Sequence, residues 1–227
     1  MSDEQLQMQG AEIDRTLFQP MADFFMHDNY NPVEFENYIF RTGYPIYRRR
    51  SDSTAYMAGW INTYRGFVLD AYVKHLLTRF VEATGCPFAP TIFTSGELRD
   101  GHVFAVSRWN NVSLYNRLDG CEATELDGLY EFEGLSGITP VILEVTFNSS
   151  ARGVRFGIDK KRELVSYLYS QPSYLCKVTP AKGKQKPGLS GRKMPYRRDI
   201  RIPKRDFRPI VRTLCSLTEK SRNPAQD

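Results

Sequence analysis

The spacing of apolar residues changes twice along this chain of 227 residues, and each change limits the folds that it can adopt. Apolar residues recur at helical spacing from about 62 to 83, and Gly85 stands where such a helix would end. Strand-like segments follow over residues 90–95, 103–107, 126–132 and 140–147. Helical spacing returns over 159–170, with Asp159 as the expected N-cap, before a last strand over 174–179. This order predicts an α/β fold in which helices flank a central mixed β-sheet.

Composition and charge divide the chain into three regions. Residues 1–60 are expected to form an N-terminal helical extension, with one helix interrupted near Pro20 and a short helix over 33–40. Residues 61–180 carry the α/β pattern, and residues 181–227 form a basic loop that leads into a C-terminal strand and helix on the core. The hydrophobic content of 41% is that of a folded protein, and the length suits one core.

Several classes of protein lack support because their motifs are missing. The sequence contains no GxxxxGK[ST], GxGxxG or GxSxG motif, and no Cys or His spacing that is typical of zinc. No apolar run reaches the roughly 18 residues that a membrane span needs. The acidic, polar N-terminus does not resemble a secretory signal. We therefore expect an intracellular protein, in the cytoplasm, nucleoid or nucleus, that does not partner a membrane.

Two carboxylates stand at unusual positions in the strand region. Glu144 follows the uninterrupted apolar run at 141–143, and Asp127 lies within the preceding strand candidate. A carboxylate in such a setting is costly unless it is paired or binds a cation. A short loop joins the two segments, so they can pair as a hairpin and place Asp127 beside Glu144. Oxygen ligands of this kind suit Mg²⁺ or Mn²⁺. Taken alone, Asp127 is more simply a turn residue and Glu144 a solvent-facing charge at a strand end, and it is the pair that indicates a function.

The same segments resemble the core of the PD-(D/E)xK nuclease superfamily, which has a restriction-endonuclease-like fold. Glu-Leu-Asp-Gly at 125–128 and Val-Ile-Leu-Glu-Val-Thr at 141–146 resemble the Asp strand and the Glu-x-Lys strand of that family. The family also has a helix before these strands, and here that helix carries an acid at Asp70. A helix and a further strand follow in the family's order, so the resemblance covers about residues 62–180. Because many enzymes of this family are dimers, a homodimer is an expected possibility.

The resemblance implies a metal-dependent endonuclease. Asp127 and Glu144 would bind the Mg²⁺ or Mn²⁺ ion, and Asp70 would support them or bind a second ion. The lysine position of the family is occupied by Thr146, which offers a hydroxyl group but no positive charge. Either another residue supplies that charge, with Thr146 contacting the metal-bound water, or cleavage has been lost.

The helix expected over 159–170 offers a replacement lysine. With Leu164, Val165 and Leu168 on one helical face, Lys161 falls near the middle of that face and Lys160 at its edge. A lysine centred on an apolar face is unusual unless its ammonium reaches a carboxylate or water. Some members of the resembling family similarly supply the lysine from this helix. We expect Lys161 first and Lys160 second in this role, with a lysine that extends to solvent as the alternative.

Positive charge is concentrated towards the C-terminus. Between 177 and 212 thirteen cationic side chains face only two aspartates, a net charge of +11, whereas the whole chain carries +5. Such a segment suits nucleic-acid phosphates, with DNA favoured over RNA, and Tyr196 and Phe207 could stack on bases if they are exposed. Two arginines between the Glu144 strand and the next helix could also hold phosphate, or belong to an ordinary charged loop. The candidate nucleic-acid-binding residues are Arg152, Arg155, Lys182, Lys184, Lys186, Arg192, Lys193, Arg197 and Arg198.

Three functional hypotheses follow from these features. The first is a Mg²⁺- or Mn²⁺-dependent endonuclease that hydrolyses phosphodiester bonds. The second is a nucleic-acid-binding module of the same fold that has lost cleavage together with the lysine at position 146. The third is a structural or assembly protein whose basic tail binds an acidic partner.

Overall fold

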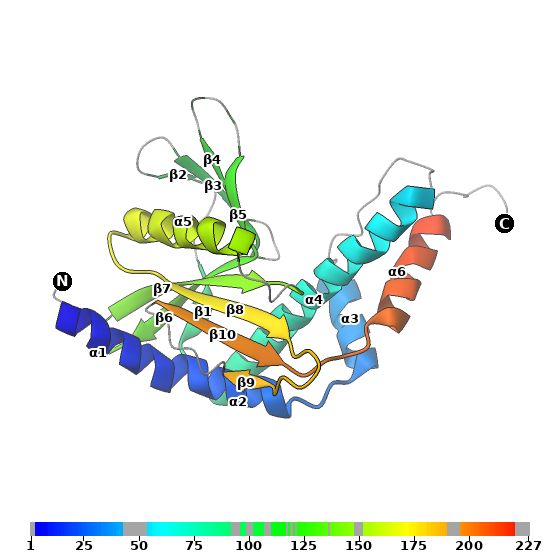
Figure 1. Ribbon diagram of the computed structural model, residues 1–227, viewed down its shortest axis with the longest axis horizontal. Helices are drawn as coiled ribbons and strands as arrows, with labels where there is room; N and C mark the ends of the chain where they lie inside the picture. The colour runs from blue at the N-terminus through cyan, green and yellow to red at the C-terminus, as the bar shows by residue number, and fades with distance from the viewer. Residues whose placement is uncertain are drawn as a thin grey trace.

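The protein contains two β-sheets and six α-helices within the residues that the structure describes (Figure 1). The structure is a computed structural model, and it describes residues 3–42, 54–91, 96–98, 102–106, 110–116, 118, 120, 122–135, 137–147, 152–189 and 196–220. In this part of the chain, no helix is long and apolar enough to cross a membrane. The first and the last described helices, which begin at residue 3 and end at residue 220, lie on opposite sides of the molecule (Figure 1).

The larger sheet is mixed. The strand β7 runs parallel to β8, and β8 runs parallel to β10, whereas the other neighbouring pairs are antiparallel. The apolar run at 141–143 is buried because helices cover both faces of the sheet. In spatial order its six strands are β1 (Phe88–Pro90), β6 (Gly128–Gly134), β7 (Gly137–Val145), β8 (Tyr174–Pro180), β10 (Arg197–Ile202) and β9 (Gly188–Leu189).

The chain segment between β1 and β6 forms a smaller antiparallel sheet. Its strands follow one another as a meander, each paired with the next. Val112 and Leu114 in this sheet are fully buried, which shows that one of its faces packs against the rest of the molecule. The four strands are β2 (Gly96–Leu98), β3 (His102–Val106), β4 (Val112–Asn116) and β5 (Glu122–Leu126).

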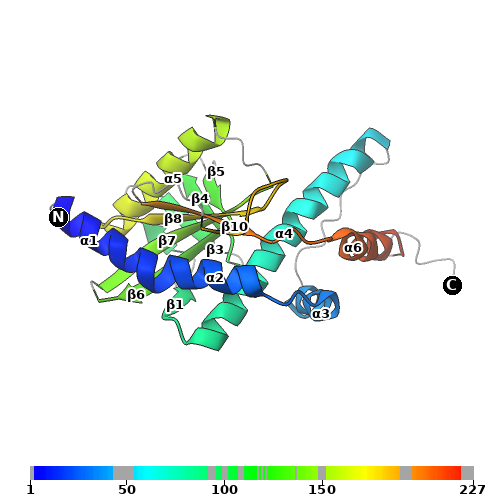
Figure 2. The same ribbon diagram turned by 60° about the horizontal axis from the view of Figure 1, so that its bottom comes forward.

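Five of the helices lie on one side of the larger sheet. The first three helical segments form a continuous rod across this face (Figure 2), and a long helix crosses it at an angle. Two further helices pack on the long helix, away from the sheet (Figure 1). The rod consists of α1 (Asp3–Ile13), the π-helical turn η1 (Asp14–Phe18) and α2 (Gln19–His27). The long helix is α4 (Thr54–Thr84), and the two helices that pack on it are α3 (Pro32–Thr42) and α6 (Arg208–Lys220).

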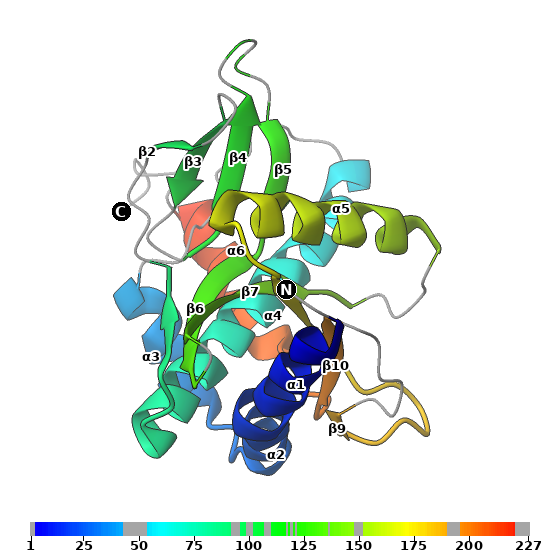
Figure 3. The ribbon, with the colours of Figure 1, turned by 90° about the vertical axis from the view of Figure 1, so that its left-hand side faces the viewer.

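The opposite face is covered by α5 (Arg152–Tyr169), which lies between the two sheets (Figure 3). Val165 of this helix is fully buried. It packs in one hydrophobic cluster with Ile142 and Leu175 of the larger sheet and Leu114 of the smaller sheet. The position of α5 decides which of its side chains can reach the end of β7.

The N-terminal helices share their core with the sheet. Leu17 and Phe25 belong to the same cluster as Val141 and Cys176. Asp28, at the end of α2, accepts hydrogen bonds from Tyr72 and from Arg79 of α4, at 3.0 and 2.5 Å. The expected division at residues 60 and 180 remains a prediction, because packing of this kind does not define independent folding units.

The predicted architecture of a mixed sheet flanked by helices is confirmed, but several elements differ from expectation. The strand candidate at 126–132 is two strands, which meet at Asp127. The helix expected from Asp159 begins seven residues earlier, so Arg152 and Arg155 lie in α5 rather than in a loop. Gly153 and Gly157 lie within α5, although glycine is unfavourable in a helix. Asn31 caps the N-terminus of α3 by accepting the main-chain N–H of Val33 at 3.0 Å, and Pro32 is the first residue of that helix.

Candidate active site at the junction of the two sheets

Asp127 lies where the smaller sheet joins the larger one, between the end of β5 and the start of β6. Gly128 pairs with Leu143 in the antiparallel ladder, so Asp127 comes opposite Glu144 near the end of β7. The main-chain N–H of Val145 donates a hydrogen bond of 2.6 Å to Oδ2 of Asp127. The predicted pairing of these segments therefore brings the two carboxylates together, and we call Asp127 and Glu144 the acidic pair.

The residue after Asp127 must be small. A Cβ atom at Gly128 would stand 2.8 Å from Cε2 of Tyr130 and 3.3 Å from Cβ of Leu143. The Tyr130 ring cannot move aside easily, because it is buried and stacked on Phe88 with 4.8 Å between the ring centroids. The missing side chain lets β6 approach β7 closely, which helps to hold the acidic pair in place.

Lys161 reaches the acidic pair from α5. Its Nζ lies 2.6 Å from Oε1 of Glu144, and the two side chains are 22% and 14% exposed. This geometry agrees with the helical-wheel prediction, since Val165 on the same helical face is buried. Lys160 is exposed on α5. The structure thus places the first of the two expected lysines beside Glu144.

Three sets of contacts fix the orientation of α5 over the sheet. Near its C-terminal end, the Tyr169 hydroxyl donates to Glu131 at 3.0 Å and lies 3.0 Å from the Thr91 hydroxyl. One turn earlier, Ser166 Oγ accepts from the main-chain N–H of Ser173 at 2.9 Å. In the middle of the helix, the Lys161 contact with Glu144 adds the third connection.

The acidic pair has an unfavourable electrostatic environment. Burial, followed by the negative charges of Glu144 and Asp70, raises the pKa of Asp127 to about 7. Burial also raises the pKa of Glu144, although Lys161 opposes this shift. The Val145 N–H favours the ionised form of Asp127 but does not outweigh burial. Adjacent acids with raised pKa values are typical of functional sites, where a bound cation would relieve the repulsion.

Asp70, the acid predicted on the preceding helix, lies close enough for its charge to affect Asp127. Its Oδ2 is 3.0 Å from Nζ of Lys74, one turn later on α4. The Lys74 ammonium also donates to Oδ1 of Asn111 at 2.9 Å. Burial lowers the pKa of Lys74, and the nearby acids Asp70, Asp127 and Glu125 oppose that shift.

Lys177 is a neighbour of the acidic pair that the sequence reasoning missed. The register of the sheet places it directly between Glu144 on β7 and Asp199 on β10, so these three side chains share one face. Lys177 is only 3% exposed, and burial lowers its pKa. Lys177 is the single charged residue in the otherwise uncharged strand at 174–180, and this pattern could have identified it. The sequence analysis counts Lys177 only among the cations of the basic segment.

The donor atoms of the acidic pair fit a divalent cation. Two carboxylates with remaining positions filled by water are an ordinary arrangement for Mg²⁺. The hydrogen bonds described above engage Oδ2 of Asp127 and Oε1 of Glu144. Within the described residues there is no group of three or more His, Cys, Asp or Glu that could hold a metal ion. A metal held by Asp127 and Glu144 would take its remaining ligands from water.

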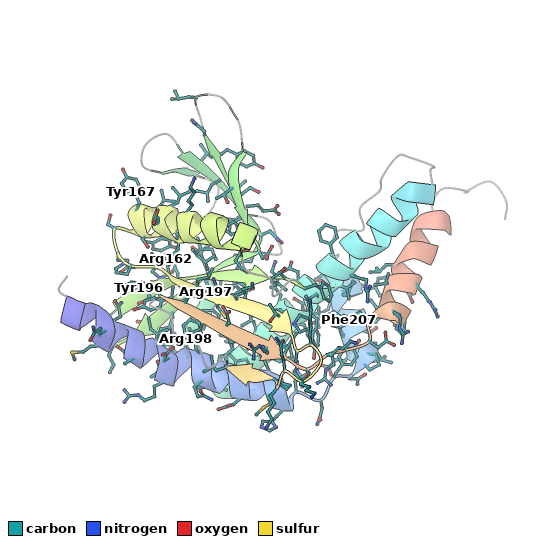
Figure 4. The ribbon with its side chains drawn as sticks, in the orientation of Figure 1. Arg162, Tyr167, Tyr196, Arg197, Arg198 and Phe207 are labelled. Atoms are coloured by element: carbon teal, nitrogen blue, oxygen red, sulfur yellow. The ribbon has the colours of Figure 1, made fainter. Side chains whose placement is uncertain are left out.

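The structure divides the predicted nucleic-acid-binding residues into different groups. Lys182, Lys184 and Lys186 are exposed in the loop between β8 and β9. Arg197 donates to both carboxylate oxygens of Asp199, at 2.8 and 3.2 Å. Arg198 binds Asp14, so it connects β10 to the N-terminal helices (Figure 4). The side chains of Arg152 and Arg155, and the whole of Arg192 and Lys193, lie outside the described residues.

The two aromatic residues suggested for base stacking are used within the fold. Phe207 is 7% exposed and belongs to the main hydrophobic cluster, so the condition for base stacking, exposure, is not met by this residue. Tyr196 is half-buried beside Tyr174, and the Arg162 guanidinium lies 4.8 Å from its ring centroid. Figure 4 shows Arg162 and Tyr196 between α5 and the start of β10. Tyr196 is therefore already packed by protein groups.

No family model matches this sequence, and comparisons with curated proteins and with solved structures gave no match. The function is therefore inferred from the residues and their geometry.

Proposed function

We propose that this protein is a metal-dependent endonuclease that hydrolyses phosphodiester bonds in nucleic acid, with a core of the PD-(D/E)xK, restriction-endonuclease-like kind. The observation that carries the proposal is the contact of Lys161 with Glu144, beside Asp127. Two carboxylates and a cation within reach of one another are the groups that metal-assisted hydrolysis of a phosphodiester requires. The lysine comes from α5, while Thr146, the residue after β7, stands at the family's lysine position.

Each group has a distinct proposed role. Asp127 and Glu144 would hold Mg²⁺ or Mn²⁺, which when bound lowers the pKa of water and stabilises negative charge on a phosphate oxygen. Lys161 would stabilise the charge that develops on the phosphate. Thr146, the residue after β7, would orient water through its hydroxyl group. The exposed lysines of the β8–β9 loop, at 182–186, would contact the nucleic-acid backbone without reading its sequence.

Cleavage assays with matched variants test this proposal. We would incubate single-stranded and duplex DNA and RNA with the protein in Mn²⁺ or EDTA. Wild type should cleave only with Mn²⁺, Glu144→Ala should be inactive, and Lys161→Ala should lose about 10²–10³-fold in rate. Lys160→Ala is the control for a lysine on the same helix and should stay active. Failure of wild type on every substrate, or unchanged cleavage by Glu144→Ala, would contradict the proposal.

A non-catalytic nucleic-acid-binding module is the second candidate, and the local balance of charge favours it. Three lysines surround the acids of this site, namely Lys74, Lys161 and Lys177. Cations supplied by the protein reduce the need for a bound metal. Binding without cleavage would favour this module. A gain of cleavage in Thr146→Lys would then identify the missing lysine as the cause, whereas loss of activity in that variant would place Thr146 in a working site.

A further inference from the structure

The buried ion pair between Asp70 and Lys74 lies next to the acidic pair, but the proposed reaction does not use it. Both residues are on α4, and they are 7% and 5% exposed. The Lys74 ammonium is 3.0 Å from Oδ2 of Asp70 and 2.9 Å from Oδ1 of Asn111. It is therefore held in a defined place by two oxygen atoms from separate parts of the chain.

The neighbourhood of Asn111 brings this ammonium to the junction of the two sheets. Asn110 donates from Nδ2 to the main-chain oxygen of Leu129, two residues after Asp127, at 3.0 Å. Asn111 follows directly and leads into β4. The start of β4 is thus attached to β6 by one asparagine and to Lys74 by the next, which keeps the ammonium beside the acidic site.

A second divalent ion at this site would compete with Lys74 for the same place. Paired metal ions in hydrolases lie about 3.5–4 Å apart and share carboxylate ligands. The acid that the sequence analysis expects for a second ion is Asp70, whose charge contributes to the raised pKa of Asp127. Mg²⁺ binds carboxylate oxygen at about 2.0–2.1 Å, so an ion on Oδ2 of Asp70 would stand close to the ammonium. Two cations so close in a buried place repel each other strongly.

We propose that Lys74 is a built-in cation that takes the place of a second metal ion, so that the site holds one divalent ion on Asp127 and Glu144. This inference rests on the proposed function, because it concerns the metal of the same site. Asp70 was expected either to support the acidic pair or to bind a second ion. Under this inference it holds Lys74 and does not bind metal.

The number of bound Mn²⁺ ions tests this inference independently of cleavage. Free Mn²⁺ would be measured by electron paramagnetic resonance during titration of the full chain at pH 8. Wild type and Asp70→Asn should each bind one ion. Lys74→Met should bind a second, because the Asp70 carboxylate loses its cation. The double variant Asp70→Asn/Lys74→Met should return to one ion, and its thermal unfolding shows whether the fold accepts an uncharged pair.

Several outcomes would overturn the inference. Two ions in wild type, two in the double variant, or only one in a folded Lys74→Met would each show that Lys74 does not exclude a second ion. If Lys74→Met does not fold, the number of Mn²⁺ ions bound by Asp70→Asn tests the inference. Fewer ions than in wild type would show that Asp70 is a metal ligand and would overturn it. A folded wild type that binds no Mn²⁺ would instead overturn the metal-dependent function itself, which distinguishes the two failures.

Discussion

Asp127 occupies a position where its negative charge is unfavourable. Burial and the neighbouring acids raise its pKa from 3.8 to about 7 in the folded protein. Between these two values the folded state binds a proton that the unfolded state has lost, so stability falls as pH rises from about 4 to 7. An acid kept in such a place despite this cost is more consistent with a functional role than with a structural one.

We therefore expect Asp127→Asn to be more stable than wild type at pH 8 in EDTA. Asparagine cannot ionise, and its side-chain oxygen can still accept the Val145 N–H. The gain should be about 2 kcal/mol, since each pKa unit corresponds to about 1.4 kcal/mol and solvent screens part of the shift. It should fade towards pH 4. Urea unfolding across this pH range measures it, with exposed Glu133→Gln as control. A variant that is less stable at pH 8 would contradict the expectation.

Gly128 shows how closely the strands approach beside the site. Gly128→Ala should destabilise the protein by about 1–3 kcal/mol, the usual cost of overpacking a core. Gly157→Ala is the matched control, because no atom lies within 4 Å of the added Cβ and alanine favours a helix. The control should be neutral or slightly stabilising in thermal unfolding. Equal stability of the two variants would mean that Tyr130 and Leu143 can move aside.

At the scale of elements, the orientation of α5 decides whether Lys161 reaches Glu144. The Tyr169 hydroxyl fixes the far end of this helix through Glu131 and Thr91. Tyr169→Phe should cost about 1–2 kcal/mol, since it removes a hydrogen bond to a partly buried carboxylate. Tyr167→Phe, on the same helix but 48% exposed, serves as control. An unchanged unfolding midpoint in Tyr169→Phe would show that hydrophobic packing alone orients α5.

At the scale of the whole molecule, the fold engages several basic side chains of the C-terminal segment in contacts with other protein groups. Arg198 binds Asp14 on the N-terminal helices, Arg197 binds Asp199, and Arg205 donates to the main-chain oxygen of Asp28 at 2.6 Å. Lys182, Lys184 and Lys186 remain exposed in the β8–β9 loop. A count of charges along the sequence therefore overstates the surface that is available to nucleic acid.

The replacement of Lys182, Lys184 and Lys186 by alanine should weaken nucleic-acid binding and make it less dependent on salt. Each lost phosphate contact lowers the slope of log K against log salt by about 0.9 on duplex DNA, so the three together should lower it by about 2–3. Arg198→Ala should instead lower thermal stability and leave the slope unchanged. No binding to DNA or RNA at low salt would favour the assembly protein with an acidic partner.

Local sequence patterns account for the elements and for the acidic pair. The apolar run at 141–143 predicted a strand covered on both faces, and the position of Glu144 at its end marked that carboxylate as unusual. The face formed by Leu164, Val165 and Leu168 pointed to Lys161. The smaller sheet was not predicted as a separate sheet, because its short strands could equally belong to one central sheet.

What the sequence determined by itself was the order of helices and strands, because periodicity and caps act within a few residues. It also identified Asp127, Glu144 and Lys161 as candidates, since each is a charge in an apolar setting. Only the tertiary structure decided which charges meet. Strand register placed Lys177 beside Glu144, and the contacts of Asn110 and Asn111 brought Lys74 to the junction of the sheets. These neighbours are far apart in the chain, and their pairing depends on packing that no local pattern encodes.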